Sequence, residues 1–398
     1  MKTIIKYLFI SLVTLAIVSC ESKYEPTLET TLSDFGFVTG DTSMVLTGTS
    51  TKTVWLKWEK STAENSTLVF YKVQFSDDQD DFSSPTYELL PGRLGSNNFV
   101  EISDSMLNII AEKSSIRQLS TEKMYWRVIA SNGINSKIAK EEKRFIEVTR
   151  PAGFAAFPEK LYITGTATPG GDDLSKAIQI KALKKKSDPT LDSVAFNIVL
   201  PLKQGEFKLV NSLQGRTRTF GFDNTGNFIE IFEDDNIKTT CPADGLYQIS
   251  LNFITNVAEY ASVSQVELVV IRNNQPDNVI TTMNHSADYT WESDFVSKLS
   301  DGANLPTGAM YKFRFSGNKV SDNSPFTAYW GSPADTSTPP NATTPESYFY
   351  VTYVENNLKN YYRFATAVSG SNSGKSMRAV LVMNPVNTNY YHSCTVIE

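Results

Sequence analysis

The sequence is poor in the residues that build most metal and thiol sites. Its 398 residues include only two histidines, His285 and His392, and three cysteines. The spacing of these residues does not suit zinc, and it does not indicate a catalytic cysteine. We therefore expect no metal site, no cofactor and no cysteine-based catalysis.

The chain also lacks a concentrated basic segment. Its 37 Lys and Arg residues are scattered among 43 Asp and Glu residues, and the formal net charge is -6. A protein that binds a phosphate backbone needs a basic patch or stripe. Nucleic acid is therefore not an expected partner.

Helical periodicity is scarce as well. Few stretches carry apolar residues at helical spacing, aromatic residues make up 12% of the chain, and Gly and Pro occur throughout. The chain is also too long for one ordinary core. These features predict an all-β protein of tandem β-sandwich domains. One short helix is expected within residues 101–114, where Met106, Ile109 and Ile110 lie near helical spacing.

The N-terminus reads as an export signal. Lysines precede an apolar run over residues 7–18, which is too short to span a bilayer comfortably. The run ends in Ser19 and Cys20, a pattern that resembles a bacterial lipobox, in which the cysteine carries the lipid. We expect a signal peptide over residues 1–19, lipidation of Cys20 and a flexible tether over residues 20–31. Acyl chains would then hold the mature protein at the membrane without a transmembrane helix.

Two further cysteines, Cys241 and Cys394, remain after the lipobox. Export permits a disulfide between them. They fall far apart, in different predicted domains, which favours two buried free thiols.

Residues 32–150 are typical of one sandwich. In "TVWLKWEKS" the alternation places Leu56 and Trp58 on one side and Trp55 and Lys57 on the other. Two more alternating stretches, "LVFYKVQFS" and "KMYWRVIAS", continue the pattern. The aromatics expected to be buried in an immunoglobulin or fibronectin type III sandwich are Trp58, Tyr71 and either Tyr125 or Trp126.

The remaining chain repeats one order of strands. After "LYITGTATPGG" come an alternating strand, a "GEFKLV" strand, a glycine turn and "DGLYQISLN". A looser version follows, with "AMYKFRFSG" and "YYRFATA" in the corresponding places. This recurrence predicts two related sandwich modules in tandem, over residues 151–258 and 259–398.

The lipobox, "YWRVIAS", "LYITGTATPGGDD" and the "GEFKL" strand before "DGLYQISLN" together resemble the SusE and SusF group of Bacteroidota outer-membrane lipoproteins. The resemblance implies carbohydrate-binding-module-like sandwiches after the immunoglobulin-like domain. It also implies a non-catalytic protein, lipid-anchored in the outer membrane and exposed on the cell surface. Such a protein would bind polysaccharide or oligosaccharide beside a TonB-dependent importer, with SusC- and SusD-like partners. Members of the group often carry a tryptophan just after the glycines, where this chain has Asp172.

A sugar ring has an apolar face and a fringe of hydroxyls, so an exposed aromatic ring with polar groups at its rim suits it. The region 289–353 has this composition. The candidate glycan-binding residues are Trp330, Trp291, Tyr329, Tyr348, Tyr350, Arg314 and Asn318. Because adjacent residues of a strand point in opposite directions, we expect one ring of the Tyr329–Trp330 pair to face solvent. Core packing is the alternative for each aromatic residue.

Two other functions compete with glycan binding. Exposed Tyr and Trp also mark protein interfaces, so the chain could be a scaffold or accessory subunit of an importer complex. A glycoside hydrolase would need two carboxyl groups about 5 to 10 Å apart. Asp234 and Asp235 are adjacent on a turn, where their side chains diverge, and no other acidic pair stands out. We therefore expect that the chain is not an enzyme.

Overall fold

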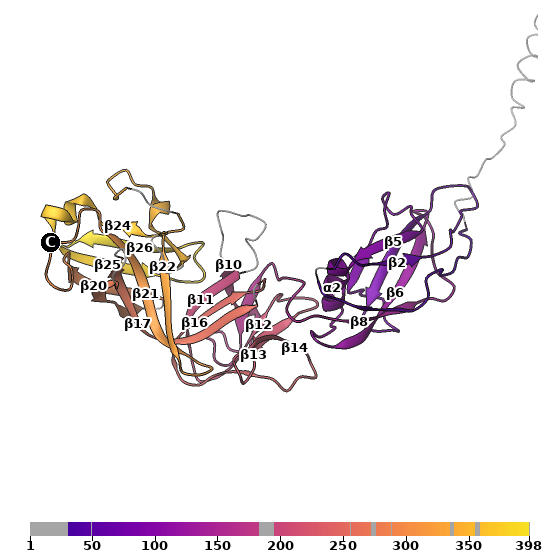
Figure 1. The fold of residues 1–398 in the computed structure, drawn as a ribbon, viewed down its shortest axis with the longest axis horizontal. Coiled ribbons are helices and arrows are strands. Elements are labelled where there is room, and N and C mark those ends of the chain that lie inside the picture. Colours follow the sequence, from indigo (N-terminus) through magenta and orange to yellow (C-terminus); the bar gives the residue numbers. More distant parts are fainter. Residues whose placement is uncertain are drawn as a thin grey trace, which may run out of the picture. The chain divides into compact units, whose positions relative to one another are not determined.

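The protein is almost entirely β, and the predicted all-β sandwich architecture is confirmed. In the computed structural model, strands and loops group into two compact units, residues 1–151 and 152–398 (Figure 1). The predicted signal peptide and Cys20 lie outside the described residues. The structure describes residues 31–48, 50–182, 195–254, 256–271, 276–287, 289–334, 338–354 and 359–397.

The first unit contains one large sheet, a two-stranded sheet and a helix. The large sheet has the order β1-β8-β6-β3-β4, with β7 also paired to β6, and β2 pairs with β5. Only the β1–β8 pair of these is parallel. The elements are β1 (Thr42–Val45), β2 (Thr53–Lys57), β3 (Phe70–Ser76), β4 (Tyr87–Leu89), β5 (Phe99–Ser103), α2 (Asp104–Lys113), β6 (Thr121–Ser131), β7 (Ser136–Ile138) and β8 (Arg144–Thr149).

The aromatic core of this unit agrees with the sequence pattern. Trp58, Tyr71 and Trp126 are buried in one hydrophobic cluster, whereas Tyr125 is only half-buried. Between the two residues considered for the last core position, the structure therefore selects Trp126. The alternation in β2 is also confirmed, because Leu56 is buried there and Trp55 is exposed.

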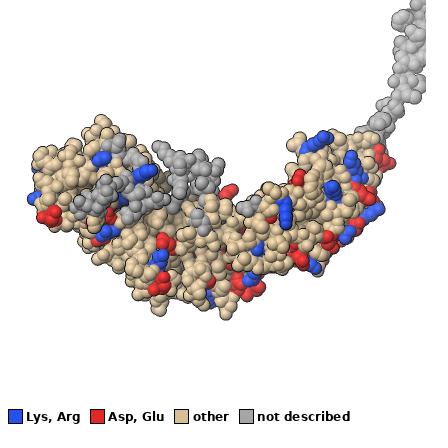
Figure 2. All heavy atoms as spheres, in the orientation of Figure 1, with Lys and Arg blue, Asp and Glu red and all other residues tan. Residues whose placement is uncertain are grey.

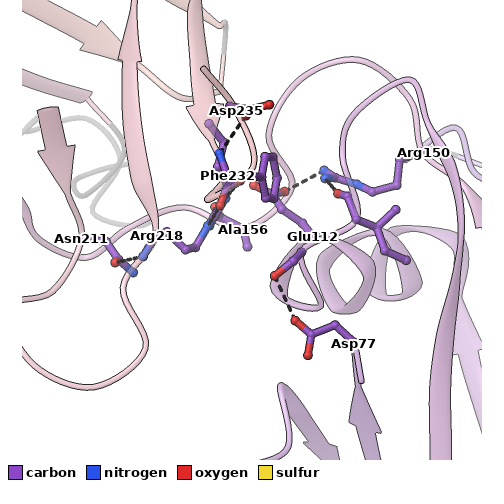
Figure 3. A network of polar contacts seen from close by, with 11 residues as sticks. Asp77, Glu112, Arg150, Ala156, Asn211, Arg218, Phe232 and Asp235 are labelled. Atoms are coloured by element: carbon purple, nitrogen blue, oxygen red, sulfur yellow. Dashed lines mark hydrogen bonds and ion pairs between the residues drawn. The ribbon is translucent and has the colours of Figure 1, made fainter. Parts of the chain in front are cut away.

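The predicted short helix is α2, and a buried ion pair links it to the end of β8. Ser103 caps the helix by accepting a hydrogen bond from the backbone N–H of Met106. Arg150, just after β8, donates from Nη2 to Oε2 of Glu112 at 2.9 Å, and both residues are labelled in Figure 3. Its Nε also donates to Oδ1 of Asn108 at 2.9 Å. These side-chain partners lie on α2, so they hold the helix against the large sheet.

The second unit contains the remaining strands and several short 3₁₀ helices. The strands are β9 (Leu161–Thr164), β10 (Ile178–Ala182), β11 (Ala195–Leu202), β12 (Gly205–Val210), β13 (Thr219–Phe222), β14 (Phe228–Ile231), β15 (Thr239–Cys241), β16 (Gly245–Asn252), β17 (Val257–Val270), β18 (Asn278–Thr282), β19 (Asn284–Ala287), β20 (Thr290–Val296), β21 (Met310–Lys319), β22 (Pro325–Gly331), β23 (Tyr350–Val354), β24 (Tyr362–Arg363), β25 (Ser376–Val382) and β26 (Tyr390–Val396). The 3₁₀ helices are η1 (Leu174–Lys176), η3 (Glu346–Phe349), η4 (Thr366–Val368) and η5 (Gly370–Asn372).

One sheet of this unit serves two hydrophobic cores. Strands β11, β16, β17, β21 and β22 are hydrogen-bonded in that order. In Figure 1, β11 lies beside β16, and β21 lies between β17 and β22. On β17, Tyr260 belongs to the core shared with β9, β12, β13 and β14, whereas the next residue, Ala261, belongs to the core shared with β20 and β25. Successive side chains of a strand point to opposite faces. The two cores therefore lie on opposite faces of this shared sheet.

The middle of β17 carries an irregularity next to a close approach of two backbones. Its register against β21 shifts between Val263 and Gln265. A Cβ atom added to Gly317 of β21 would lie closer to the carbonyl oxygen of Ser262 than the van der Waals radii of the two atoms allow. Only glycine fits where the two backbones come this close.

The predicted boundary between residues 258 and 259 falls inside β17. The division of residues 151–398 into two modules therefore stays a prediction, although each half has its own core. Cys241 and Cys394 are both free thiols, as the sequence favoured, but only Cys241 is buried and Cys394 is half-buried. Acidic and basic side chains are interspersed over the coloured surface in view (Figure 2). No helix among the described residues is both long and apolar enough to span a bilayer.

Candidate functional site

Both predicted tryptophan platforms lie in the hydrophobic core. Trp330 is 1% exposed and Trp291 is 2% exposed. The indole of Trp330 packs against Phe315, and its N–H donates to Oε1 of Gln248 at 3.4 Å. Trp291 packs against the other side of the same core, also near Phe315. The expectation that these rings could serve as open platforms is wrong, because β22 and β20 turn them into the space between two sheets.

Tyr329 does not face solvent either. It is 7% exposed, and it packs against Val269, Ile271 and Val354 on the face of the shared sheet opposite Trp330. The two adjacent rings do point in opposite directions, as the strand geometry predicts. The expectation that one of them is open is nevertheless wrong, because apolar side chains cover both.

The predicted tyrosines of β23 and its flank have different surroundings. The hydroxyl of Tyr348 accepts a hydrogen bond from the backbone N–H of Arg363 at 3.0 Å, so this ring anchors its loop. Tyr350 is half-buried and lies directly opposite Tyr391 of β26. Tyr391 is 44% exposed, and directly opposed residues share a face, so this pair lies on the outer surface of its sheet.

Arg314 and Tyr329 are brought together with two acidic residues that the sequence did not single out. They are direct cross-strand neighbours on β21 and β22, and Arg314 is also paired with Glu267 of β17. Nη2 and Nε of Arg314 lie 2.8 Å and 2.9 Å from Oε2 of Glu267. Nη1 lies 3.7 Å from Oδ2 of Asp277, and the same oxygen accepts a hydrogen bond from the Tyr329 hydroxyl at 2.6 Å.

The electrostatics of this cluster follow from its burial. Burial, followed by the hydrogen bond to Asp277, raises the pKa of Tyr329 to about 12. Burial alone would lower the pKa of Arg314, but the hydrogen bond and charge of Glu267 outweigh it and the pKa is raised. Both side chains therefore keep one protonation state across the physiological pH range. Lys312 is fully buried on the same strand face, and its Nζ lies 6.0 Å from the Tyr329 ring centroid.

Asn318 lies on the same sheet face as Arg314, toward its exposed end. Arg314, Ser316 and Asn318 alternate along β21 with the core residues Phe313 and Phe315. Across the neighbouring strands, Ser316 is paired with an exposed glutamine on β17 and an exposed threonine on β22. We call this surface the polar face, and its members are Gln265, Glu267, Arg314, Ser316, Asn318, Thr327 and Tyr329.

Comparison with known proteins gives one family. Residues 21–129 match the model of the SusE outer membrane protein family. The protein is SusE-like over this segment. The matched segment lies in the first unit and ends inside β6, and it supports an outer-membrane location. No curated protein matches the chain.

The polar face lies outside the SusE-like segment, so it rests on the structure alone. Sequence reasoning missed Glu267, Asp277, Gln265 and Thr327. The alternation in "MYKFRFSGNK" does place Arg314, Ser316 and Asn318 on one face. The pairing of β21 with β17 brings residues about 50 positions apart together, and no local pattern carries that information. Among the described residues, no group of three or more His, Cys, Asp or Glu side chains could hold a metal ion.

Proposed function

We propose that the protein is a cell-surface lipoprotein that binds polysaccharide without cutting it, next to a TonB-dependent glycan importer. The SusE-like segment supports an outer-membrane setting, and the lipobox-like Ser19–Cys20 supports a lipid anchor. The polar face is the proposed glycan contact in the second unit. Lipid attachment predicts that Cys20→Ala releases the protein from outer-membrane vesicles in a washed preparation, whereas the unaltered protein stays with them.

A single observation carries the choice of the polar face. Two of the seven predicted glycan-binding residues, Arg314 and Asn318, lie on it with side chains that reach solvent, and a third, Tyr329, lies on it but is buried. Beyond the ion pair, its exposed part offers the amides of Gln265 and Asn318 and the hydroxyl of Thr327. A glycan presents a dense set of hydroxyl donors and acceptors, and these side chains can both donate to it and accept from it.

The ion pair keeps the polar face in one geometry. Arg314 holds Oε2 of Glu267 with two nitrogens, Nε at 2.9 Å and Nη2 at 2.8 Å. The strands beneath are fixed by the Phe313 and Phe315 core. A pre-organised array loses less conformational entropy on binding than mobile side chains do.

We expect the individual site to be weak. A dissociation constant between roughly 1 mM and 1 μM corresponds to about -4 to -8 kcal/mol. Many anchored copies facing a repeating polymer would raise the overall avidity by linking separate sites. Weak single sites are therefore compatible with firm retention of a polysaccharide at the surface.

The test is affinity gel electrophoresis of the chain from Glu21 to Glu398 in gels that contain amylopectin, xylan, mannan or β-glucan. The proposal predicts retardation by at least one polymer and a marked loss of retardation in the triple variant Gln265→Ala, Asn318→Ala, Thr327→Ala. All three side chains are exposed, so the variant should fold normally. Full retardation of the folded triple variant would remove the polar face from the proposal. Release of reducing ends would contradict non-catalytic binding.

A second candidate function is a protein-contacting accessory subunit. It is favoured by exposed apolar side chains on the first unit, including Phe70, Leu90, Leu94 and Ile138. Phe70 and Ile138 lie on β3 and β7, which flank β6 in the large sheet. Absence of retardation by every polymer, together with co-purification of a membrane protein that is lost in Phe70→Ser and Ile138→Ser, would favour this function.

A further inference from the structure

One tryptophan of the five is open to solvent. All five lie within the described residues, and Trp55 is 42% exposed whereas the other four are buried. Phe99 is 36% exposed, and its ring centroid lies 5.5 Å from that of Trp55 with 34° between the ring planes. The first unit therefore displays two neighbouring rings that its core does not use.

These rings stand on the outer face of the two-stranded sheet formed by β2 and β5. Figure 1 shows these two strands next to each other in the first unit. Each strand alternates, so Leu56 and Ile102 enter the core while every second residue points outward. Trp55 is directly opposite Glu101, and Lys57 is directly opposite Phe99. We call this surface the aromatic platform, and its members, all exposed, are Thr53, Trp55, Lys57, Phe99, Glu101 and Ser103.

The backbone beneath the platform is held firmly. The edge of β2 that faces away from β5 is hydrogen-bonded to a preceding segment. The backbone N–H groups of Val38 and Thr39 donate to the carbonyl oxygen of Lys57 at 2.9 Å and 3.0 Å. The hydroxyl of Thr39 donates to the carbonyl oxygen of Trp55 at 3.0 Å. The inward neighbour Leu56 is fully buried. The Trp55 ring is thus presented by a fixed strand, which suits a binding surface.

The chemistry of the rim indicates what the rings can bind. The platform carries one cation, Lys57, and one carboxylate, Glu101, so its charges balance and suit an uncharged ligand. The two remaining non-aromatic members, Thr53 and Ser103, each carry a hydroxyl group. A protein docking surface of this size would have an apolar centre with charged groups excluded from it. Here the charged groups flank the rings directly, since the Lys57 ammonium lies 5.2 Å from the Trp55 ring centroid.

We propose that the aromatic platform is a second carbohydrate site, which binds a neutral glycan by stacking a sugar ring on Trp55. Phe99 extends the apolar surface, and Lys57 and Glu101 bond hydroxyls at the edge of the sugar. The cation–π contact of an exposed lysine is worth about 0.5 to 1 kcal/mol, so a stacking sugar can displace the ammonium toward its own hydroxyls. This inference rests on the proposed function, and it assigns part of the glycan contact to the SusE-like segment itself.

Acrylamide quenching of tryptophan fluorescence tests the site, because four of the five indoles are shielded by burial. Quenching is measured on the chain from Glu21 to Glu398 with and without soluble amylopectin, xylan, mannan or β-glucan. The polymer that retards the protein in a gel should lower the quenching slope by at least about twofold, since a bound ligand covers most of the ring. Trp55→Phe should show little quenching without polymer, and addition of the polymer should not change its quenching slope.

The matched variants are Trp55→Ala and Tyr391→Ala, which remove similarly exposed rings from the two units. Trp55→Ala should weaken binding about tenfold, and Trp55→Phe, which keeps an aromatic surface, should weaken it less. Tyr391→Ala should leave both the affinity and the protection of Trp55 unchanged. Retardation by a polymer that leaves the quenching slope and the Trp55→Ala affinity unaltered would overturn the platform while the proposed function stands. Absence of any retardation or protection would overturn both.

Discussion

Arg314 binds a single oxygen of Glu267 with two of its nitrogens, at 2.8 Å and 2.9 Å, on the face of a sheet whose other side is hydrophobic core. The Glu267 side chain is only 9% exposed. Removal of the guanidinium would leave a largely buried carboxylate without its cation. Arg314→Ala should therefore lower the free energy of unfolding by about 3 kcal/mol, as measured by urea denaturation.

The control for this prediction is the double variant Arg314→Ala, Glu267→Ala. If the loss comes from the unpaired carboxylate, removal of both partners should cost clearly less than the sum of the two single changes. Asn318→Ala, an exposed change on the same strand, should alter stability by less than about 0.5 kcal/mol. Additive single and double losses would show that the pair does not act as a unit.

His392 makes the stability of the second unit depend on pH. Its Nδ1 lies 3.0 Å from the carbonyl oxygen of Phe349, and its Nε2 lies 2.9 Å from the Tyr311 hydroxyl. A neutral ring protonated on Nδ1 satisfies both contacts. Burial lowers its pKa from 6.5 to about 3. Between these values the unfolded chain binds a proton that the folded chain does not, so this group lowers stability as the pH falls.

The expected slope from His392 approaches about 1.4 kcal/mol per pH unit well below pH 6.5. Unfolding free energies measured from pH 7 to pH 4 should fall less steeply in His392→Gln than in the unaltered chain. The exposed His285 is the matched control, and His285→Gln should keep the original slope. Equal slopes in all three proteins would mean that His392 takes up its proton over the same pH range in the folded and the unfolded chain.

Gly317 should tolerate no side chain. A Cβ atom there would overlap the carbonyl oxygen of Ser262, which belongs to a neighbouring strand and cannot move aside. Gly317→Ala should therefore separate β17 from β21 locally and cost about 2 kcal/mol or more. Gly40→Ala, at a position with open space and an ordinary backbone angle, should be close to neutral. Thermal denaturation compares the two, and equal transition temperatures would contradict the close approach.

The two remaining thiols should be unreactive in the folded protein. Cys241 lies in a hydrophobic core, and burial raises the pKa of Cys394 to about 12. Because the thiolate is the reactive form, a disulfide reagent at pH 8 should modify neither residue in the chain from Glu21 onward. Both should react after addition of denaturant. Rapid modification of one thiol in the native protein would show that its surroundings open readily.

Local patterns were sufficient for the first unit. Alternation in "TVWLKWEKS" assigned Leu56 and Trp58 to the core and Trp55 to the outside, and the structure agrees. These residues sit in a sheet with one covered face, so the side a residue points to decides whether it is buried. The helix α2 was also predictable, because its apolar residues lie at helical spacing.

The same reasoning failed for the tryptophans of the second unit for a physical reason. Alternation correctly placed Trp330 and Tyr329 on opposite faces of β22, but at this end of the strand both rings are buried. On the Tyr329 side, the ring packs with Val269 and Ile271, about 60 positions earlier in the chain, and with Val354. Strand periodicity gives the direction of a side chain and says nothing about what distant segment packs over it. The exposed tryptophan was instead Trp55, which the alternation had placed outward without assigning it a role.

The most direct test of polysaccharide binding is isothermal titration calorimetry with the polymer that retards the protein in gels. Three proteins are compared: the unaltered chain from Glu21 to Glu398, the polar-face triple variant, and the triple variant that also carries Trp55→Ala. Binding in two places predicts a dissociation constant between roughly 1 mM and 1 μM for the first, weaker binding for the second and no measurable heat for the third. Equal binding by all three folded proteins would contradict the account.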